Sequence, residues 1–416
     1  MQRRNRWLGA GALAVIGALA LSACGSGFSS SSGGSSGGKL TSSKKALTVL
    51  IGSSGPAETT AVTSAVSSWS KTSGTSAKVI AASDLSQQLS QGFASGKPAD
   101  VFYLGNTDLA GYASAGDLLA YGNKLPNKSD FYPSLTKAFT YNNQLYCAPK
   151  DLSTLQLVIN DSLWQKAGLT KADYPTSWDQ LESVAKKLTS KSVVGLSMNG
   201  QYERMGAFMV EAGGNLMNPT STKATADSAA NVTALTYVKK LLNEGVMKYS
   251  KDVGESDGGQ ALGAGKAAMT VEGNWVTGEL KSDFPTVKYT VVPLPSGPSG
   301  KGTLVYTNCW GIAKDSPNQA AALKLVEKLT SESDQLAFSK AFGVLPSIQS
   351  AAAKWKTQNP ALVPFLDGVS YAQGVPASKN SAAVVTDFDS KLETLATSDP
   401  KTILAAVQTN LQATLK

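Results

Sequence analysis

Two side chains in the second half of the chain have the chemistry to bind a polar ligand. Trp275 follows a Gly-Asn pair in a loop and not in an apolar run. The flat face of an indole suits the C–H surface of a sugar and buries a large area at low entropic cost, although the residue could instead pack under its lobe. Arg204 is the only arginine beyond residue 6. Its planar fork of donors can bind vicinal hydroxyls or a carboxylate; the alternative is an internal pair with Glu203 or a nearby acid.

Further polar side chains stand where predicted strands end. Short apolar runs at 47–51, 77–81 and 100–104, separated by helical patterns, predict a β-α-β-α-β arrangement. Such strands form a parallel or mixed sheet, and ligands collect at the carboxyl ends of its strands. The side chains predicted to lie there are Ser53, Ser54, Glu58, Asn106 and Asp108. Glu58 could instead simply favour the N-terminus of the helix predicted from Pro56 to about Thr72.

Several residues along the chain are predicted to begin helices. Asp84 can cap a helix that continues to about Phe93. Ser177 with Gln180, and Ser316 with Gln319, have capping-box spacing. Each of these serines is therefore expected to cap the apolar helix that follows it.

The composition excludes several functions. The chain contains no histidine, so a Ser-His-Asp or Cys-His enzyme and a histidine-bound zinc site are excluded. We expect no metal and no cofactor. The net charge is +8, but the basic residues are scattered singly or in pairs, which argues against nucleic acid as a partner. A secreted glycoside hydrolase or lyase would need two carboxylates about 5–9.5 Å apart across a cleft, and no recognisable pair is present.

The N-terminus has the features of an export signal. Arg3, Arg4 and Arg6 precede an uncharged run of 15 residues, 7–21, which is shorter than the roughly 20 residues of a membrane-spanning helix. The run ends in Leu-Ser-Ala-Cys24-Gly, which resembles the lipobox of bacterial lipoproteins. This predicts removal of residues 1–23, a diacylglyceryl group on Cys24, and a Ser/Gly-rich tether at 24–45. The protein would then be anchored to the outer face of the cell membrane. The alternative is an ordinary signal peptide with a coincidental cysteine.

Six motifs follow one another through the rest of the chain. They occupy residues 99–119, 145–149, 158–169, 175–181, 265–275 and 342–346. The most telling is Gly-Lys-Ala-Ala-Met at 265–269, followed by Gly-Asn-Trp at 273–275. In this order they resemble the carbohydrate-binding class of ABC-importer solute-binding proteins, the group that includes maltose-binding protein. One departure is that 158–160 lacks the usual Tyr and Lys.

The resemblance implies a two-lobed periplasmic-binding-protein-like α/β fold. Each lobe would be a mixed β-sheet flanked by helices, and crossover strands would form a hinge that lets the lobes close on the ligand. Lobe 1 would comprise 46–148 and 311–346, and lobe 2 would comprise 151–308 and 350–416. The expected partners are a small carbohydrate and the membrane permease subunits of the importer, and the expected state is a monomer.

The resemblance also assigns roles to individual residues. It places a stacking aromatic at Trp275 and an aromatic that faces the cleft in the 199–204 loop, where Tyr202 stands. Asp151, just past a crossover strand, is a further acceptor candidate, and Trp310, at another crossover, could line the cleft or pack in the hinge.

The two cysteines beyond Cys24 are Cys147 and Cys309. An even pair outside the cell suggests one disulfide. In the resembling family the two segments are neighbouring crossover strands, which implies a bond across the hinge. The alternative is two buried thiols that merely lie near each other.

Other functions remain open at this stage. The same fold could bind a polyamine, a phosphorylated compound or a peptide, or it could serve as a sensor or adhesion lipoprotein without transport.

Overall fold

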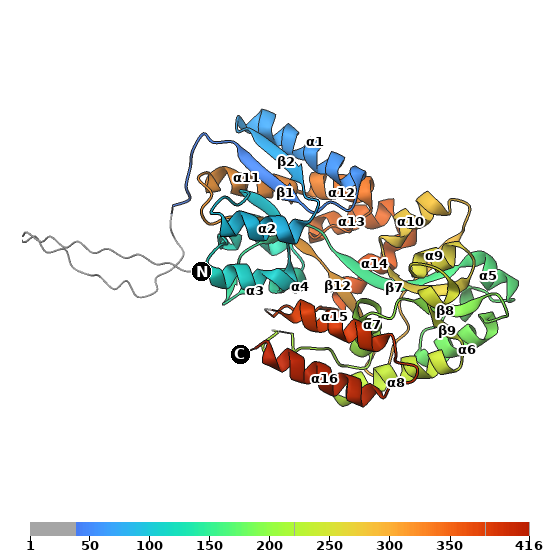
Figure 1. Ribbon diagram of the computed structural model, residues 1–416. Helices are drawn as coiled ribbons and strands as arrows, with labels where there is room; N and C mark the ends of the chain where they lie inside the picture. Colours follow the sequence, from blue (N-terminus) through green and yellow to red (C-terminus); the bar gives the residue numbers. More distant parts are fainter. Residues whose placement is uncertain (1–38, 220, 379, 416) are drawn as a thin grey trace, which may run out of the picture. The chain divides into compact units, whose positions relative to one another are not determined.

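The computed structural model describes residues 39–219, 221–378 and 380–415. The predicted signal peptide, the lipidation site Cys24 and the tether up to residue 38 lie outside these residues. From Leu40 onward the chain forms one unit built on two large β-sheets (Figure 1). Among the described residues, no helix combines the length and the apolar character needed to span a bilayer.

The first sheet contains five strands, which are adjacent in the order β2-β1-β3-β13-β6. Their bounds are Leu47–Ile51 for β1, Ala77–Ala81 for β2, Val101–Gly105 for β3, Ala148–Pro149 for β6 and Asn308–Ile312 for β13. The β1 strand is parallel to both β2 and β3, whereas β13 is antiparallel to β3 and β6. The predicted β-α-β-α-β start is therefore confirmed, and the last two strands make the sheet mixed.

Alternating side chains bury both faces of this sheet. Val49 and Ile51 lie in one apolar cluster with helices α1 (Pro56–Ser73) and α11 (Gln319–Leu329). Leu50 lies in another with α2 (Leu85–Ala94) and α3 (Asn106–Ala115). The helices thus cover both faces and leave the strand ends for polar side chains.

The second sheet has the order β14-β12-β7-β10-β8-β9, and β11 pairs with β7. The bounds are Ser153–Asn160 for β7, Val194–Met198 for β8, Met247–Tyr249 for β9, Ala267–Gly273 for β10, Tyr289–Val292 for β11, Thr303–Tyr306 for β12 and Ala372–Gly374 for β14. The β10 strand lies between β7 and β8, antiparallel to the first and parallel to the second.

Helices from distant parts of the chain bury the two faces of the second sheet (Figure 1). One face packs against α6 (Trp178–Leu188), α7 (Tyr202–Glu211), α8 (Ala229–Asn243), α15 (Ser381–Leu392) and α16 (Pro400–Ala413). The other packs against α9 (Gly258–Gly263), α10 (Val276–Asp283), α13 (Gln349–Gln358) and α14 (Val363–Asp367).

Three segments pass between the sheets. Residues 150–152 connect β6 to β7, and Thr307 connects β12 to β13. The third follows α12 (Glu332–Phe342), where Leu345 forms an antiparallel bridge with Leu152. The lobe bounds expected from the sequence stay a prediction.

One predicted helix cap is wrong. Ser177 does accept a hydrogen bond from Gln180 N and caps α6 as expected. At α11, however, the Ser316 hydroxyl donates to Asp100 instead, and the first backbone N–H of the helix donates to the hydroxyl of Thr41 (3.1 Å). A segment of chain 278 residues away thus replaces the local cap.

Candidate functional site

Trp275 stands at the carboxyl end of β10, immediately before α10. Its side chain is 39% exposed, whereas the other five tryptophans among the described residues are between 1% and 7% exposed. Its indole N–H donates to Glu272 Oε2 (2.9 Å). The polar edge of the ring is therefore satisfied internally, and much of its apolar surface faces solvent.

Arg204, in the first turn of α7, lies against the ring of this indole. Its Nε donates to Glu272 Oε1 (3.0 Å) and its Nη2 lies 2.8 Å from Glu272 Oε2. The guanidinium carbon lies 5.2 Å from the centroid of the Trp275 ring. Arg204 thus takes up the internal alternative, with Glu272 and not Glu203 as its acid. Burial keeps the pKa of Glu272 above its ordinary value although Arg204 lowers it.

Tyr306, which the sequence did not single out, completes this group. Its ring meets the Trp275 ring edge-on, with 5.9 Å between centroids and 72° between planes. Its hydroxyl donates to the backbone carbonyl of Glu203. Trp275, Arg204, Glu272 and Tyr306 are called the aromatic group below.

The prediction that Tyr202 offers a ring to a ligand does not fit the structure. Its side chain is fully buried in the core of the second sheet, and its hydroxyl donates to Asn215 Oδ1 (2.6 Å). Tyr202 and Arg204 are two residues apart on a helix, so they point in different directions, and only Arg204 reaches Trp275.

A second polar group lies where the first crossover leaves the first sheet. The Lys150 ammonium lies 3.1 Å from Glu58 Oε1 and also contacts the carboxylate of Asp151. The Tyr103 hydroxyl donates to the same Glu58 oxygen (2.9 Å). The other Glu58 oxygen accepts from the backbone N–H (2.8 Å) and the hydroxyl (2.7 Å) of Ser54. Lys150, Glu58, Asp151, Tyr103 and Ser54 are called the ionic group below. Glu58 and Asp151 belong to the site residues predicted from the sequence.

Electrostatics within the ionic group differ between its two acids. Burial alone would raise the pKa of Glu58, but the charge of Lys150 and the hydrogen bonds from Ser54 leave it below its ordinary value. Burial keeps the pKa of Asp151 above its ordinary value although Lys150 lowers it. Burial lowers the pKa of Lys150, but the two carboxylates outweigh it and raise that pKa overall. Lys150, like Tyr306, was not among the site residues predicted from the sequence.

Asn106 and Asp108 lie in the first turn of α3, at the end of β3. Asn106 is 9% exposed, and Asp108 is exposed. A methyl group placed on Gly105 would lie 3.7 Å from both Asp108 Oδ2 and Asn308 Oδ1. Polar side chains from α3 and β13 therefore converge at the end of β3, and Asn308 is an addition to the predicted set.

The prediction that Trp310 could line the cleft does not fit the structure, because its side chain lies in the core of the first sheet. Trp310 is 1% exposed, and its ring lies 4.8 Å from that of Tyr103, edge to face. The Tyr121 hydroxyl donates to the carbonyl of Trp310 and accepts from Ala148 N (2.8 Å). Tyr121 thereby ties two strands of the first sheet together.

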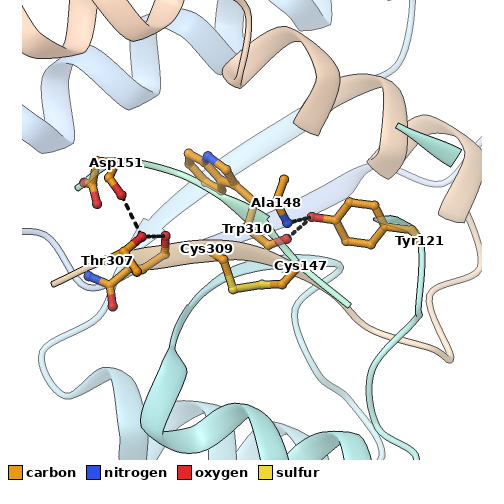
Figure 2. Close-up of a disulfide and its surroundings, with 8 residues drawn as sticks. Tyr121, Cys147, Ala148, Asp151, Thr307, Cys309 and Trp310 are labelled. Atoms are coloured by element: carbon orange, nitrogen blue, oxygen red, sulfur yellow. Dashed lines mark hydrogen bonds between the residues drawn. A yellow bond between two sulfur atoms is a disulfide. The ribbon is translucent and has the colours of Figure 1, made fainter. Parts of the chain in front are cut away.

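Next to this contact, Cys147 and Cys309 are joined by a disulfide (Figure 2). Their Cα atoms are 5.6 Å apart, within the range that a disulfide tolerates. Cys309 pairs in register with Pro149 on β6. Nearby, the Thr307 hydroxyl donates to the carbonyl of Asp151 (2.7 Å), so both crossover segments are bound to each other beside the ionic group.

Two contacts place the aromatic group and the ionic group at the same boundary between the two sheets. Asn274, adjacent to Trp275, donates from Nδ2 to the carbonyl of Gly343 (2.8 Å). Phe342, adjacent to Gly343, lies 5.6 Å from the Lys150 ammonium. A hollow of about 410 Å³ elsewhere, between β2 and α2, is lined by none of the predicted site residues.

The arrangement offers an apolar ring face and several hydrogen-bonding groups, but no metal-binding cluster. Among the described residues, no three His, Cys, Asp or Glu side chains are grouped so that they could hold a metal ion.

Solved structures share this fold. A cyclic α-maltosyl-1,6-maltose-binding protein from Arthrobacter globiformis has a TM-score of 0.79 at 20% identity, over 89% of this chain and 98% of its own. An ABC substrate-binding protein from Listeria monocytogenes, in complex with cycloalternan, has a TM-score of 0.76 at 22% identity, over 90% of this chain and 99% of its own. The predicted two-sheet α/β fold class is thereby confirmed.

Sequence comparison identifies the family. The diacetylchitobiose-binding protein of Streptomyces coelicolor is 24% identical over 284 residues, which are 65% of this chain and 66% of that protein. The family described as bacterial extracellular solute-binding protein matches residues 49–336, more than half of the chain. The predicted resemblance is confirmed, and with it the prediction that the protein binds a solute and is not an enzyme. The chain belongs to the bacterial extracellular solute-binding proteins.

Proposed function

We propose that this protein captures a sugar or an oligosaccharide and delivers it to the permease subunits of an ABC importer. The observation that carries the proposal is Trp275, the one tryptophan of the described residues with substantial exposure. Its N–H is already bonded to Glu272, so the ring contributes apolar surface and not a donor. Such a surface suits stacking on the C–H face of a sugar.

The polar residues supply what a sugar needs besides stacking. Binding sites fix orientation with a few well-placed hydrogen-bonding groups. Asp108 and Asn308 converge at the end of β3, and their side-chain oxygens can accept hydrogen bonds from hydroxyl groups. We expect the ligand to lie between these residues and Trp275.

The named relatives support the sugar assignment. They bind diacetylchitobiose, cyclic α-maltosyl-1,6-maltose and cycloalternan. These ligands differ in size and linkage, so the proposal is restricted to the carbohydrate class.

The test is a binding screen on the wild-type mature chain. Diacetylchitobiose, maltotetraose and lactose are titrated by calorimetry after a thermal-shift screen, in which a ligand at 100 times its Kd stabilises by about 2.7 kcal/mol. Saturation should also reduce the radius of gyration in small-angle scattering, because the lobes close. Turnover of any of these sugars would contradict a binding-only role.

A non-sugar solute is the competing proposal, and one observation favours it. The ionic group places two carboxylates on one ammonium, and an exposed indole can bind a cation through its ring face. Spermidine and glycerophosphocholine therefore belong in the same screen. Binding of either one, with no response to the sugars, would replace the carbohydrate assignment.

The location is proposed from the N-terminal motif. The mature chain should begin at a lipidated Cys24, held to the outer face of the membrane by its acyl chains, since two chains anchor stably where one does not. Mass spectrometry of protein from membranes should give a chain that lacks residues 1–23 and carries diacylglycerol. An unmodified Cys24 would contradict this.

A further inference from the structure

Glu272 is a carboxylate in an unusual position for a strand at the centre of a sheet. It is 1% exposed and lies on β10 opposite Gln156 of β7. Both of its oxygens are occupied: Oε1 accepts from Arg204 Nε (3.0 Å), and Oε2 accepts from Trp275 Nε1 (2.9 Å) and lies 2.8 Å from Arg204 Nη2. One carboxylate thus holds two side chains that come from different elements.

Stability alone does not explain the buried ion pair of Arg204 and Glu272. Taking two charges out of water costs several kcal/mol per ion, and apolar residues of similar volume are often as stabilising. The bond to Glu272 is bidentate, a geometry that arginine makes and lysine does not. The only arginine beyond residue 6, in a chain rich in lysine, stands here. The site therefore needs an explanation other than folding.

The Trp275 ring is confined on several sides. The Arg204 guanidinium lies over it, and Tyr306 meets it edge-on. The backbone of Gly273 lies against its six-membered ring so closely that an added Cβ would be 2.1 Å from Cζ3. With the N–H bonded to Glu272, contacts within the protein alone fix the orientation of the indole.

From these contacts we infer that Glu272 and Arg204 are positioning residues: they hold the indole of Trp275 in one orientation, with its free surface presented to the ligand. The inference rests on the proposed role of Trp275 in ligand binding. Ordering a flexible side chain on binding costs about 0.5–1.5 kcal/mol. A ring that is already ordered avoids this cost. Loss of the Glu272–Arg204 pair, called the clamp below, should therefore weaken binding by about threefold to tenfold.

The decisive variant replaces the whole pair by apolar side chains, Arg204→Met with Glu272→Met. No buried charge is left unpaired, so this double variant should fold, whereas Glu272→Ala alone could fail to fold. The matched control replaces a distant ion pair in the same way, Lys328→Met with Asp334→Met.

Two measurements need no sugar. Acrylamide quenching reports mainly on Trp275, because the other described tryptophans are buried. In protein labelled with 5-fluorotryptophan, Trp275→Phe assigns the ¹⁹F resonance of Trp275. In the double variant we expect a broadened or split resonance and stronger quenching. In Glu272→Gln, which keeps an oxygen acceptor for the indole, we expect a smaller change, and in the control none.

The third measurement is the Kd of whichever of maltotetraose, diacetylchitobiose or lactose binds the wild type most tightly. Increased ring mobility together with a threefold to tenfold weaker Kd in the double variant would support the inference. A sharp, unchanged resonance in the double variant would overturn it, and so would a mobile ring with an unchanged Kd. If none of the three sugars binds the wild type, the proposed function fails, and the ¹⁹F resonance still decides whether the clamp orders the ring.

Discussion

The aromatic group and the ionic group both bury charge, but they balance it differently. Glu272 meets one guanidinium, so the aromatic group pairs one anion with one cation, and the surface it exposes is the apolar face of Trp275. In the ionic group one ammonium serves the two carboxylates Glu58 and Asp151. The comparison teaches that one side of the boundary balances its buried charges and exposes an apolar face, whereas the other holds an excess of buried negative charge around one ammonium.

The largest expected effect concerns the disulfide, which lies beside the ionic group and not the aromatic one. Replacing Cys147 and Cys309 by serine should lower the free energy of unfolding by up to about 5 kcal/mol, because the bond closes a long loop. Urea unfolding of the oxidised wild type and the double variant measures this. Thiol titration of the unfolded, unreduced wild type should find no reactive thiol at these positions, and two would refute the bond.

Loss of Lys150 should cost nearly as much. Lys150→Met leaves two buried carboxylates without a counter-ion, which we expect to destabilise the protein by about 3–5 kcal/mol. Replacing the balanced pair in the aromatic group, Arg204→Met with Glu272→Met, should change stability much less. Equal losses of unfolding free energy in the two proteins would remove the distinction between the groups.

The effect of Trp275 should appear in binding and not in folding. Trp275→Ala should weaken binding of the sugar found in the screen by about 1–3 kcal/mol, as measured by calorimetry. The melting temperature should stay close to that of the wild type, because the side chain is substantially exposed. Unchanged affinity would place Trp275 outside the ligand site. Trp164→Phe, at a buried indole, is the control and should leave the affinity unchanged.

The smallest expected effect is a pH dependence of stability, which has opposite signs for Glu58 in the ionic group and for Glu279 beside the aromatic group. The pKa of Glu58 lies below its ordinary value, so its ionised form stabilises the fold above the unfolded pKa of about 4.5, and this contribution is lost as the pH falls. Glu279, on α10 next to Trp275, has its pKa raised to about 7, first by burial and then by the charge of Asp257. Its ionisation therefore opposes folding as the pH rises from about 4.5 to 7.

Two variants separate these contributions. The melting temperature of Glu58→Gln should fall furthest below the wild type at neutral pH, and the gap should narrow on acidification. The melting temperature of Glu279→Gln should rise relative to that of the wild type as the pH increases from about 4.5 to 7. Melting curves from pH 4 to 8 test both, and parallel curves for either variant would contradict the corresponding shift.

The sequence predicts the elements better than the site. Alternating and helical apolar patterns are local, and they locate β1, β2 and α1 within one or two residues of their ends. The loop position of Trp275 leaves open whether the ring meets a ligand or packs under its lobe, and the structure shows it exposed. Lys150 and Glu58, by contrast, are 92 residues apart, and Arg204 and Glu272 are 68 residues apart. Such pairs depend on tertiary packing, which no local pattern encodes.

The two wrong site predictions have a common cause. A loop or strand position indicates that a residue is near a site, but the direction of its side chain depends on the alternation of the element. Trp310 pairs with Tyr103 across the first sheet, and both side chains point into its core. Tyr202 turns into the core of the second sheet in the same way.

The substitute cap on α11 also determines how a mechanical load would enter the protein. Thr41 accepts from Gln319 N through its hydroxyl and from Ala320 N through its carbonyl, and its own N–H donates to Gln319 Oε1. A force applied through residues that precede Leu40 would therefore reach α11 before it reached β1. Under the proposed tether, the attachment to the membrane would thus load the first sheet through α11, on the opposite side of the crossover segments from Trp275.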